Sequence, residues 1–161
     1  MSVKAVKQYL SRFGMEERIR ELSLSSATVE LAAQALGVAP ERIAKTLSFS
    51  VGEDTVLVVA AGDARIDNAA FRSQFAVKAR MLPADLAEEK IGHAVGGVCP
   101  FAVKEGVKVY LDRSLRRFKT VYPACGSSNS AIEMTIAELE QTSGCLSWVD
   151  VCKGWQGSED L

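Results

Sequence analysis

The chain has 161 residues, of which 48% are hydrophobic and 24% are charged. This length and composition are typical of one globular domain with a substantial core, and they exclude global disorder. The formal net charge is -1, so no global basic field attracts nucleic acid. An RNA partner would therefore have to be bound by a local patch, by its acceptor end alone, or with a helper protein.

No export or membrane segment is expected. Met1–Gln8 lacks the apolar core of a signal peptide, and the longest apolar run, Val56–Ala61, is too short to cross a bilayer. We therefore expect a soluble, cytosolic protein. The four cysteines show no Cys-x-x-Cys spacing and the chain has one histidine, so neither a structural zinc site nor a disulfide is expected. Plain packing is the expected role of Cys145 and Cys152.

The first half of the chain predicts both helices and strands. Apolar residues at three- and four-residue spacing from Val3 to Phe13 predict an amphipathic helix that ends at Gly14. Ser26 or Thr28 caps a second helix, which runs through Leu36 and ends at Gly37. The other elements predicted here are a strand over Ile19–Leu24, a short helix opened by Pro40, a hairpin of Leu47–Val51 and Thr55–Ala61, a helix over Asn68–Phe75 capped by Asp67, and a strand in the short, mixed segment Ala76–Leu82.

The second half continues the mixture. Pro83–Ile91 predicts a helix whose charges suit the helix dipole, and Thr135 with Glu138 forms a capping box for a helix that stops at Gly144. Strands are predicted over Val107–Leu111, Lys119–Cys125, Ala131–Met134 and Leu146–Val151. The irregular order predicts a single mixed α+β domain with a sheet of about six strands. The polar tail from Lys153 is expected to fray, unless Trp155 docks.

The segment Gly92–Phe101 is the first candidate for a functional site. Two adjacent glycines and Pro100 interrupt an apolar run that would otherwise predict a buried strand. The segment alone fits a backbone-built pocket wall and an ordinary strand–loop junction about equally well. Two further segments belong with it. Pro40–Phe49 delivers Lys45 into a strand, and Ala124–Met134 carries a small polar loop into another strand.

Three motifs follow one another along the chain: a lysine, then Gly-Gly-x-x-Pro, then Gly-Ser-Ser-Asn, with Ala61–Asp67 between the first two. This combination resembles the aminoacyl-tRNA editing domain family. That family includes the free-standing YbaK-like deacylases and the insertion domain of bacterial prolyl-tRNA synthetases. The resemblance covers residues 1–153 as one editing domain and leaves 154–161 as a polar tail. It implies a YbaK-like fold, in which a curled, partly barrel-like mixed sheet has helices outside it and a pocket at one end.

The resemblance also implies an activity. The expected enzyme is an aminoacyl-tRNA deacylase acting in trans, which cleaves the ester between a wrongly attached amino acid and the 3′-terminal adenosine. Cysteine or alanine on proline tRNA ranks first, ahead of other small amino acids. No metal or cofactor is implied. The expected partners are the acceptor end of aminoacyl-tRNA and a prolyl-tRNA synthetase, with the enzyme a monomer or a homodimer.

Each candidate site residue has a role under this resemblance. Lys45 aligns with the functional lysine of the family and would anchor the terminal phosphate. Gly96 and Gly97 would frame the amino acid, and their amides would stabilise the developing oxyanion. Enlarging Gly97 is expected to exclude the larger substrates first. The residues expected to contact substrate around them are Asp63, Arg65, His93, Pro100, Gly126, Ser127 and Asn129.

Simpler roles remain open for several of these residues. Asp63 and Arg65 fit an ion pair across a loop, His93 fits a structural position, and the loop from Gly126 to Asn129 fits a tight turn. The basic cluster of Arg113, Arg116 and Arg117 fits a solvated face as well as a phosphate-contacting patch.

Two other functions remain as alternatives. One is a hydrolase that uses Cys99 and His93, and the other is a non-catalytic module that binds tRNA or a nucleotide. The serine-hydrolase elbow and the phosphate-binding loop are absent from the sequence.

Overall fold

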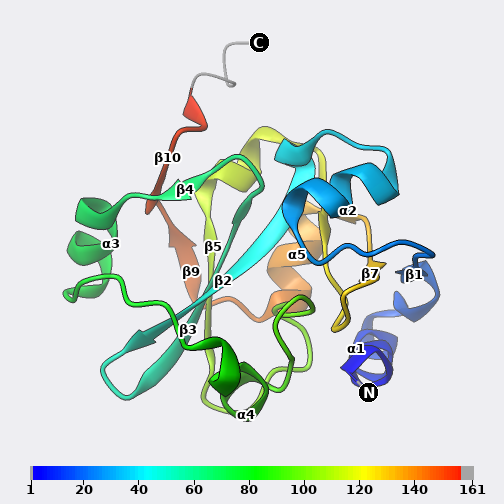
Figure 1. Cartoon of the computed structure of the whole chain (residues 1–161), viewed down its shortest axis with the longest axis horizontal. Helices are drawn as coiled ribbons and strands as arrows, with labels where there is room; N and C mark the ends of the chain where they lie inside the picture. Colours follow the sequence, from blue (N-terminus) through cyan, green and yellow to red (C-terminus); the bar gives the residue numbers. More distant parts are fainter. Residues whose placement is uncertain (1, 157–161) are drawn as a thin grey trace.

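A computed structural model describes residues 2–156 of the chain. Its centre is a six-stranded mixed sheet with the strand order β8-β6-β2-β3-β5-β9. Four of these strands, β2, β3, β5 and β9, are labelled in Figure 1. The strands of this sheet are β2 (Ile43–Val51), β3 (Asp54–Ala61), β5 (Lys108–Asp112), β6 (Thr120–Pro123), β8 (Met134–Thr135) and β9 (Ser147–Val149). The two smaller ladders pair β1 (Arg20–Glu21) with β7 (Ser130–Ala131) and β4 (Arg65–Ile66) with β10 (Cys152–Lys153).

Helices flank this sheet. The α-helices are α1 (Ser2–Leu10), α2 (Val29–Leu36), α3 (Asn68–Phe75), α4 (Ala87–Ile91) and α5 (Ile136–Ser143). The 3-10 helices are η1 (Ser11–Phe13), η2 (Glu16–Arg18), η3 (Pro40–Arg42), η4 (Ala84–Leu86) and η5 (Arg113–Arg117). The predicted α+β fold with a curled mixed sheet and outer helices is therefore confirmed. Within residues 2–156, no helix combines the length and apolarity needed to span a membrane.

Local chemistry explains where most helices begin and end. The Thr28 hydroxyl accepts a hydrogen bond from the N–H of Leu31 at the start of α2, and Gly37 ends that helix at φ 71°. Asp67 caps α3. Thr135 and Glu138 form the predicted capping box of α5. These helix predictions are confirmed.

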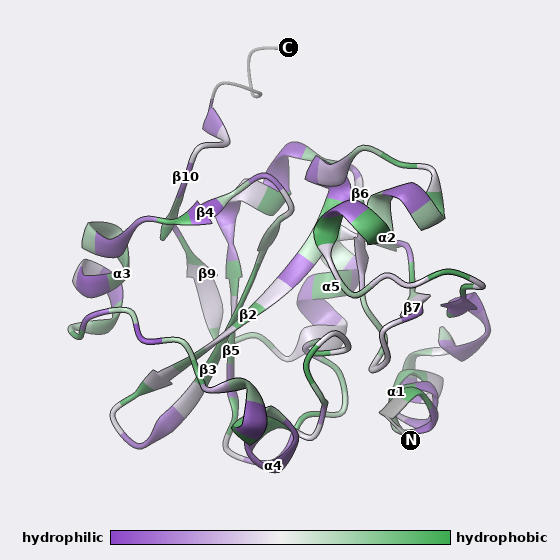
Figure 2. Cartoon of the chain, in the orientation of Figure 1, coloured by the Kyte–Doolittle hydropathy of each residue, from purple (hydrophilic) through white to green (hydrophobic). Residues whose placement is uncertain are grey.

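The core lies on both faces of the sheet, because β3 is buried on both sides. One face carries Leu57 and Val59 and packs against α1, α5 and the 92–103 loop. The other face carries Val56 and Val58 and packs against α3 and Trp155. Figure 2 shows hydrophobic colouring along the central strands and hydrophilic bands on α1, α3 and α4.

Two predicted strands are wrong in extent. Of Ile19–Leu24, only the two residues of β1 are a strand, because their partner β7 is equally short. Ala131–Met134 is divided between β7 and β8, because the chain leaves β1 there and pairs next with β6.

The predicted strand over Ala76–Leu82 is also wrong. Ala76 ends α3 with φ 64°, and only the last residues of the segment reach the sheet. They form a single bridge, between Met81 and Phe49. The segment thus covers only one end of the β2 edge and leaves room beside the rest.

The C-terminal part of the described chain is packed. Lys153 belongs to β10, and Trp155 is buried with 1% of its surface exposed. The guanidinium groups of Arg113 and Arg117 lie 5.2 and 5.1 Å from the Trp155 ring centroid. Fraying from Lys153 onward is therefore wrong as far as Trp155. The rest of the predicted tail, 157–161, lies outside the described residues.

Candidate functional site

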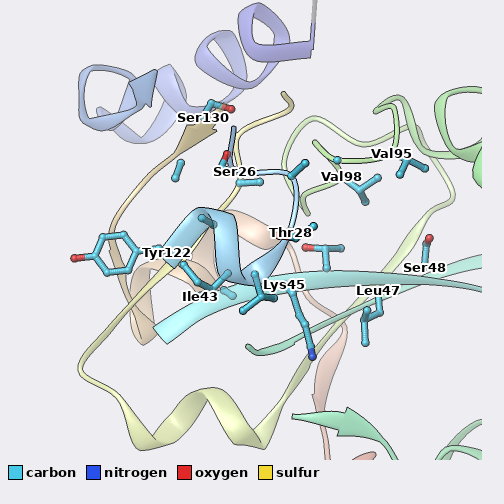
Figure 3. Close-up of a pocket in the computed structure, with 18 of the residues that line it drawn as sticks. Ser26, Thr28, Ile43, Lys45, Leu47, Ser48, Val95, Val98, Tyr122 and Ser130 are labelled. Carbon is cyan, nitrogen blue, oxygen red and sulfur yellow. The ribbon is translucent and has the colours of Figure 1, made fainter. Parts of the chain in front are cut away.

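A cavity of about 440 Å³ lies beside β2, a size typical of small-molecule sites (Figure 3). Its floor is the stretch of β2 from Ile43 to Ser48. The segment 26–29 leads into α2 and forms one wall, and Val95, Gly96 and Val98 contribute to another. In Figure 3, Tyr122 lies on the opposite side of the view from these valines. The segments from Pro40, Gly92 and Ala124 that the sequence singled out therefore do meet at one cavity.

The cavity exists because the edge of β2 is interrupted. β6 pairs with β2 only at Ile43 and Ala44. The 80–82 segment covers the same edge further on, where the Leu82 N–H donates to the Ser48 carbonyl at 3.0 Å. Neither neighbour pairs with the three residues between these points, 45–47. The open stretch of β2 therefore lies between β6 at one end and the 80–82 segment at the other.

Thr46 stands at the centre of this open stretch. In an antiparallel pair, the backbone groups of alternate residues point to the same edge. Those of Ser48 and Ser50 point away from β3, because they bond Leu82 and Arg80. The N–H and C=O of Thr46 therefore point the same way, into the break. No hydrogen bond to either group is found among residues 2–156. The strand offers a ligand one donor and one acceptor here.

Lys45 lies on the same open stretch, with its side chain on the opposite face from that of Thr46. Its ammonium group donates to the Gly62 carbonyl at 3.2 Å and to the Ala64 carbonyl. Burial lowers the pKa of Lys45, while the negative charge of Asp63 opposes that shift. Figure 3 shows the amine extending from β2, away from the serines of the opposite wall. The third N–H of the ammonium group is available for an anion or a carbonyl.

The two glycines of the 92–101 loop have different surroundings. Gly96 lines the cavity and adopts φ 96°. Gly97 does not line it. A Cβ at position 97 would lie 2.6 Å from the Ser127 nitrogen and 2.7 Å from the Gly126 carbonyl carbon, so only glycine allows the two loops to touch. The Gly97 N–H already donates to the Ala94 carbonyl at 3.1 Å, so it is not free for an oxyanion.

The 126–129 loop supports the cavity wall from behind. The Ser128 carbonyl accepts a hydrogen bond from the Ser26 N–H at 2.5 Å. The Asn129 side chain donates to the Leu22 carbonyl at 3.0 Å, and the Ser127 hydroxyl contacts that of Ser130 at 2.8 Å. Ser130 reaches the cavity, whereas Gly126, Ser127 and Asn129 are not among the lining residues.

Asp63 and Arg65 lie near the Lys45 amine, outside the cavity lining. The Asp63 carboxylate forms a two-point ion pair with Arg117, with distances of 2.5 and 2.9 Å. Arg65 is exposed in β4, and its guanidinium lies beside Gly154. The turn to which they belong, 62–65, supplies the Gly62 and Ala64 carbonyls that hold Lys45.

His93, Cys99 and Pro100 are buried behind the loop, outside the cavity lining. His93 Nε2 lies 2.6 Å from the Phe101 carbonyl and 3.5 Å from Cys99 Sγ. Burial raises the pKa of Cys99 to about 12 and lowers that of His93. A thiol that stays protonated and is shielded from substrate is a poor nucleophile, so the geometry does not favour the cysteine hydrolase.

Sequence reasoning missed two residues of the site. The Ser26 and Thr46 hydroxyls are buried, and neither has a hydrogen-bond partner within residues 2–156. The sequence suggests only a helix cap for Ser26 and no role for Thr46. The alternation along β2 could have placed Thr46 opposite Lys45, but no local pattern shows that a hydroxyl lacks a partner.

The basic cluster is largely structural. Arg117 has only 6% of its side chain exposed, and besides Asp63 it donates to the Ser114 carbonyl at 2.9 Å. Arg113 pairs with Asp150 at 3.2 Å. Arg116 is exposed and lies 4.1 Å from the Trp148 ring centroid. A phosphate patch made of all three arginines would have to break the Arg117 contacts.

We expect Arg117→Ala to lower the free energy of unfolding by about 2–4 kcal/mol, because it leaves the Asp63 carboxylate without its partner. Arg116→Ala is the matched control and should cost under about 1 kcal/mol. Urea unfolding followed by circular dichroism measures both changes. If both variants lose the same free energy of unfolding, the buried contacts of Arg117 stabilise the protein no more than the exposed contact of Arg116 does.

The structure is an α+β fold with a cavity of small-molecule size beside an open edge of β2, and comparison with known proteins agrees with this fold. The model of the aminoacyl-tRNA editing domain matches residues 25–142. The chain therefore belongs to the aminoacyl-tRNA editing domain family. A curated relative, the uncharacterized protein YwhH of Bacillus subtilis (strain 168), is 51% identical over 97% of this chain and 100% of its own length.

Solved structures extend the likeness. A proposed trans-editing enzyme for prolyl-tRNA synthetase superposes with a TM-score of 0.85 at 27% identity, over 95% of this chain and 98% of that one. The hypothetical protein APE2540 gives a TM-score of 0.82 at 29% identity, over 92% and 99% of the two chains. The resemblance suggested by the three short motifs is confirmed at the level of family and fold.

Proposed function

We propose that this protein is a trans-editing hydrolase, which removes a small, wrongly attached amino acid from the 3′ end of a tRNA. The reaction adds water across the ester and yields the free amino acid and an intact tRNA hydroxyl. Such a step is needed wherever a synthetase pocket cannot strongly reject a similar small substrate. Membership of the editing domain family supports the reaction class.

The observation that carries the proposal is the open stretch of β2. It brings an ammonium group, Lys45, and the unpaired backbone of Thr46 to one cavity. An aminoacyl ester is already activated, so a positioned water and a few fixed dipoles suffice for its hydrolysis. Lys45 holds the terminal phosphate beside the ester. The N–H of Thr46 faces the ester carbonyl, and Gly96 bounds the space left for the side chain.

The tRNA is held by its acceptor end. The net charge of -1 and the engagement of Arg113 and Arg117 in structural contacts both argue against a broad RNA-binding surface. The cavity is larger than a small amino acid, so it has room for the ester and part of the terminal nucleoside. The sequence ranks cysteine and alanine on proline tRNA first, and the likeness to a proposed prolyl-tRNA synthetase trans-editing enzyme supports proline tRNA as the carrier.

The test is a panel of mischarged tRNAs incubated with the purified protein. We expect release of at least one small amino acid well above the rate in buffer, with tRNA that can be charged again. Acceptor-end binding without release of any amino acid would replace the hydrolase with the non-catalytic binding module. Retention of activity after thiol alkylation would complete the case against a cysteine nucleophile.

A further inference from the structure

Two residues that line the cavity have buried hydroxyl groups without a hydrogen-bond partner among residues 2–156. Ser26 is 8% exposed, and its Oγ is shielded from solvent and unpartnered within the described chain. Thr46 Oγ1 is in the same state. A buried polar atom without a hydrogen bond destabilises the fold, so each such atom requires an explanation. A ligand that supplies the missing partner is one explanation.

The two hydroxyls belong to the same cavity but come from different elements. Ser26 lies in the segment that leads into α2, and Thr46 lies on the β2 floor. The Ser130 hydroxyl, in a third part of the wall, already contacts Ser127 at 2.8 Å. Much of the remaining lining is aliphatic and includes Val29, Ile43, Leu47, Leu82, Val95 and Val98. A mostly apolar pocket with a few convergent polar groups is how proteins fix the orientation of a small ligand.

We propose that the cavity selects an amino acid whose side chain carries a hydroxyl group, so that the preferred substrate is a seryl or threonyl ester, and that Ser26 and Thr46 determine this preference. The inference rests on the proposed function and names its substrate class. Both hydroxyl oxygens are shielded in the structure, so recognition requires a rotation about χ1 that turns each one toward the space that its residue lines. A substrate hydroxyl can donate to one of them and accept from the other, because a hydroxyl does both.

This chemistry reverses the ranking expected from the sequence. Alanine has no group to pair with either hydroxyl, so its ester leaves both unpartnered. The thiol of cysteine is only a weak donor and acceptor. Sites built to hydrogen-bond a substrate hydroxyl reject analogues that lack it far more strongly than apolar pockets reject a change in size. Serine and threonine are therefore preferred to alanine and cysteine here.

Substitutions of nearly the same shape test the proposal. Thr46→Val and Ser26→Ala each remove one hydroxyl. Ser50→Ala is the matched control, because Ser50 lies on the same face of β2 but does not line the cavity. Single-turnover hydrolysis is measured for seryl, threonyl, alanyl and cysteinyl esters of one tRNA. In the wild type, the seryl or threonyl ester should be cleaved at least about tenfold faster than the alanyl ester.

The variants should change this ratio in a specific way. Thr46→Val and Ser26→Ala should each lower the seryl-to-alanyl ratio by about threefold to tenfold, and Ser50→Ala should keep it. Neither hydroxyl makes a hydrogen bond to any residue of the described range 2–156, so the urea midpoints of Thr46→Val and Ser26→Ala should equal or exceed that of the wild type. This stability readout separates loss of recognition from misfolding.

The outcomes distinguish the inference from the proposed function. A wild-type enzyme that cleaves the alanyl or cysteinyl ester as fast as the seryl and threonyl esters overturns the hydroxyl preference and leaves the hydrolase intact. If the preference for seryl or threonyl esters persists in both Ser26→Ala and Thr46→Val, these two hydroxyls do not cause it. Failure to cleave any ester overturns the hydrolase, and the substrate class with it.

Discussion

Replacing Lys45 by alanine is expected to lower ester hydrolysis by about a hundredfold or more, while the fold remains intact. The ammonium group borders the cavity and is held by the Gly62 and Ala64 carbonyls, so its charge is already positioned before substrate arrives. Removing one preorganised electrostatic contact from an active site has effects of this size. Single-turnover hydrolysis of the most sensitive mischarged tRNA, under identical conditions for each variant, measures the loss.

Two further variants make the Lys45 result specific. Lys45→Arg keeps the charge but not the compact ammonium, so it should restore only part of the rate. Lys90→Ala removes an exposed lysine near the end of α4, outside the cavity lining, and should match the wild type. Circular dichroism and urea unfolding check the fold of each protein. A folded Lys45→Ala protein with the wild-type rate would remove Lys45 from the site.

Replacing Gly97 by alanine is expected to destabilise the protein by about 2–3 kcal/mol, and valine should cost more. The new Cβ would lie within 2.7 Å of backbone atoms of Gly126 and Ser127, and backbone cannot move aside as a flexible side chain can. All substrates should lose activity together, because the loop shifts as a whole. The sequence alone led us to expect a size filter at Gly97, and the structure assigns this residue to loop packing instead.

Gly106→Ala is the comparison variant for this prediction, because it strains the backbone without placing a Cβ against another loop. Gly106 has a positive φ, 92°, which Gly97 does not have, and no atom lies within 4 Å of the position that its Cβ would occupy. Its substitution carries backbone strain without a collision and should cost about 1 kcal/mol. Urea unfolding measures both variants. If Gly97→Ala is no less stable than Gly106→Ala and discriminates among substrates by size, the loop-contact account is wrong.

The sequence predicts the elements that local chemistry controls. Thr28, Asp67 and the Thr135–Glu138 pair cap helices where their spacing indicates, because a cap depends only on neighbours within one turn. The hairpin of β2 and β3 follows from its two apolar runs. The position of Lys45 on β2 also follows from the sequence, and its role in the site stays a prediction. These signals lie within a few residues of each other in the chain.

The rest depends on contacts between distant segments. Part of the β2 edge is unpaired because β6 pairs with only two residues of β2. Nothing in the sequence of either strand indicates where this pairing stops. Gly97 is required by its contact with Ser127, which is far away in sequence. The unpartnered state of Ser26 and Thr46 depends on every segment that surrounds them. Such features appear only once the chain is folded.

The measurement that tests the editing account most directly is a competition between two charged forms of one tRNA. Proline tRNA carrying proline and the same tRNA carrying a small wrong amino acid, such as serine, alanine or cysteine, are mixed in equal amounts with the wild-type protein. The account predicts that the wrong ester disappears first, while the prolyl ester remains near its level in buffer. Cleavage of both esters at the same rate, or of neither, would contradict it.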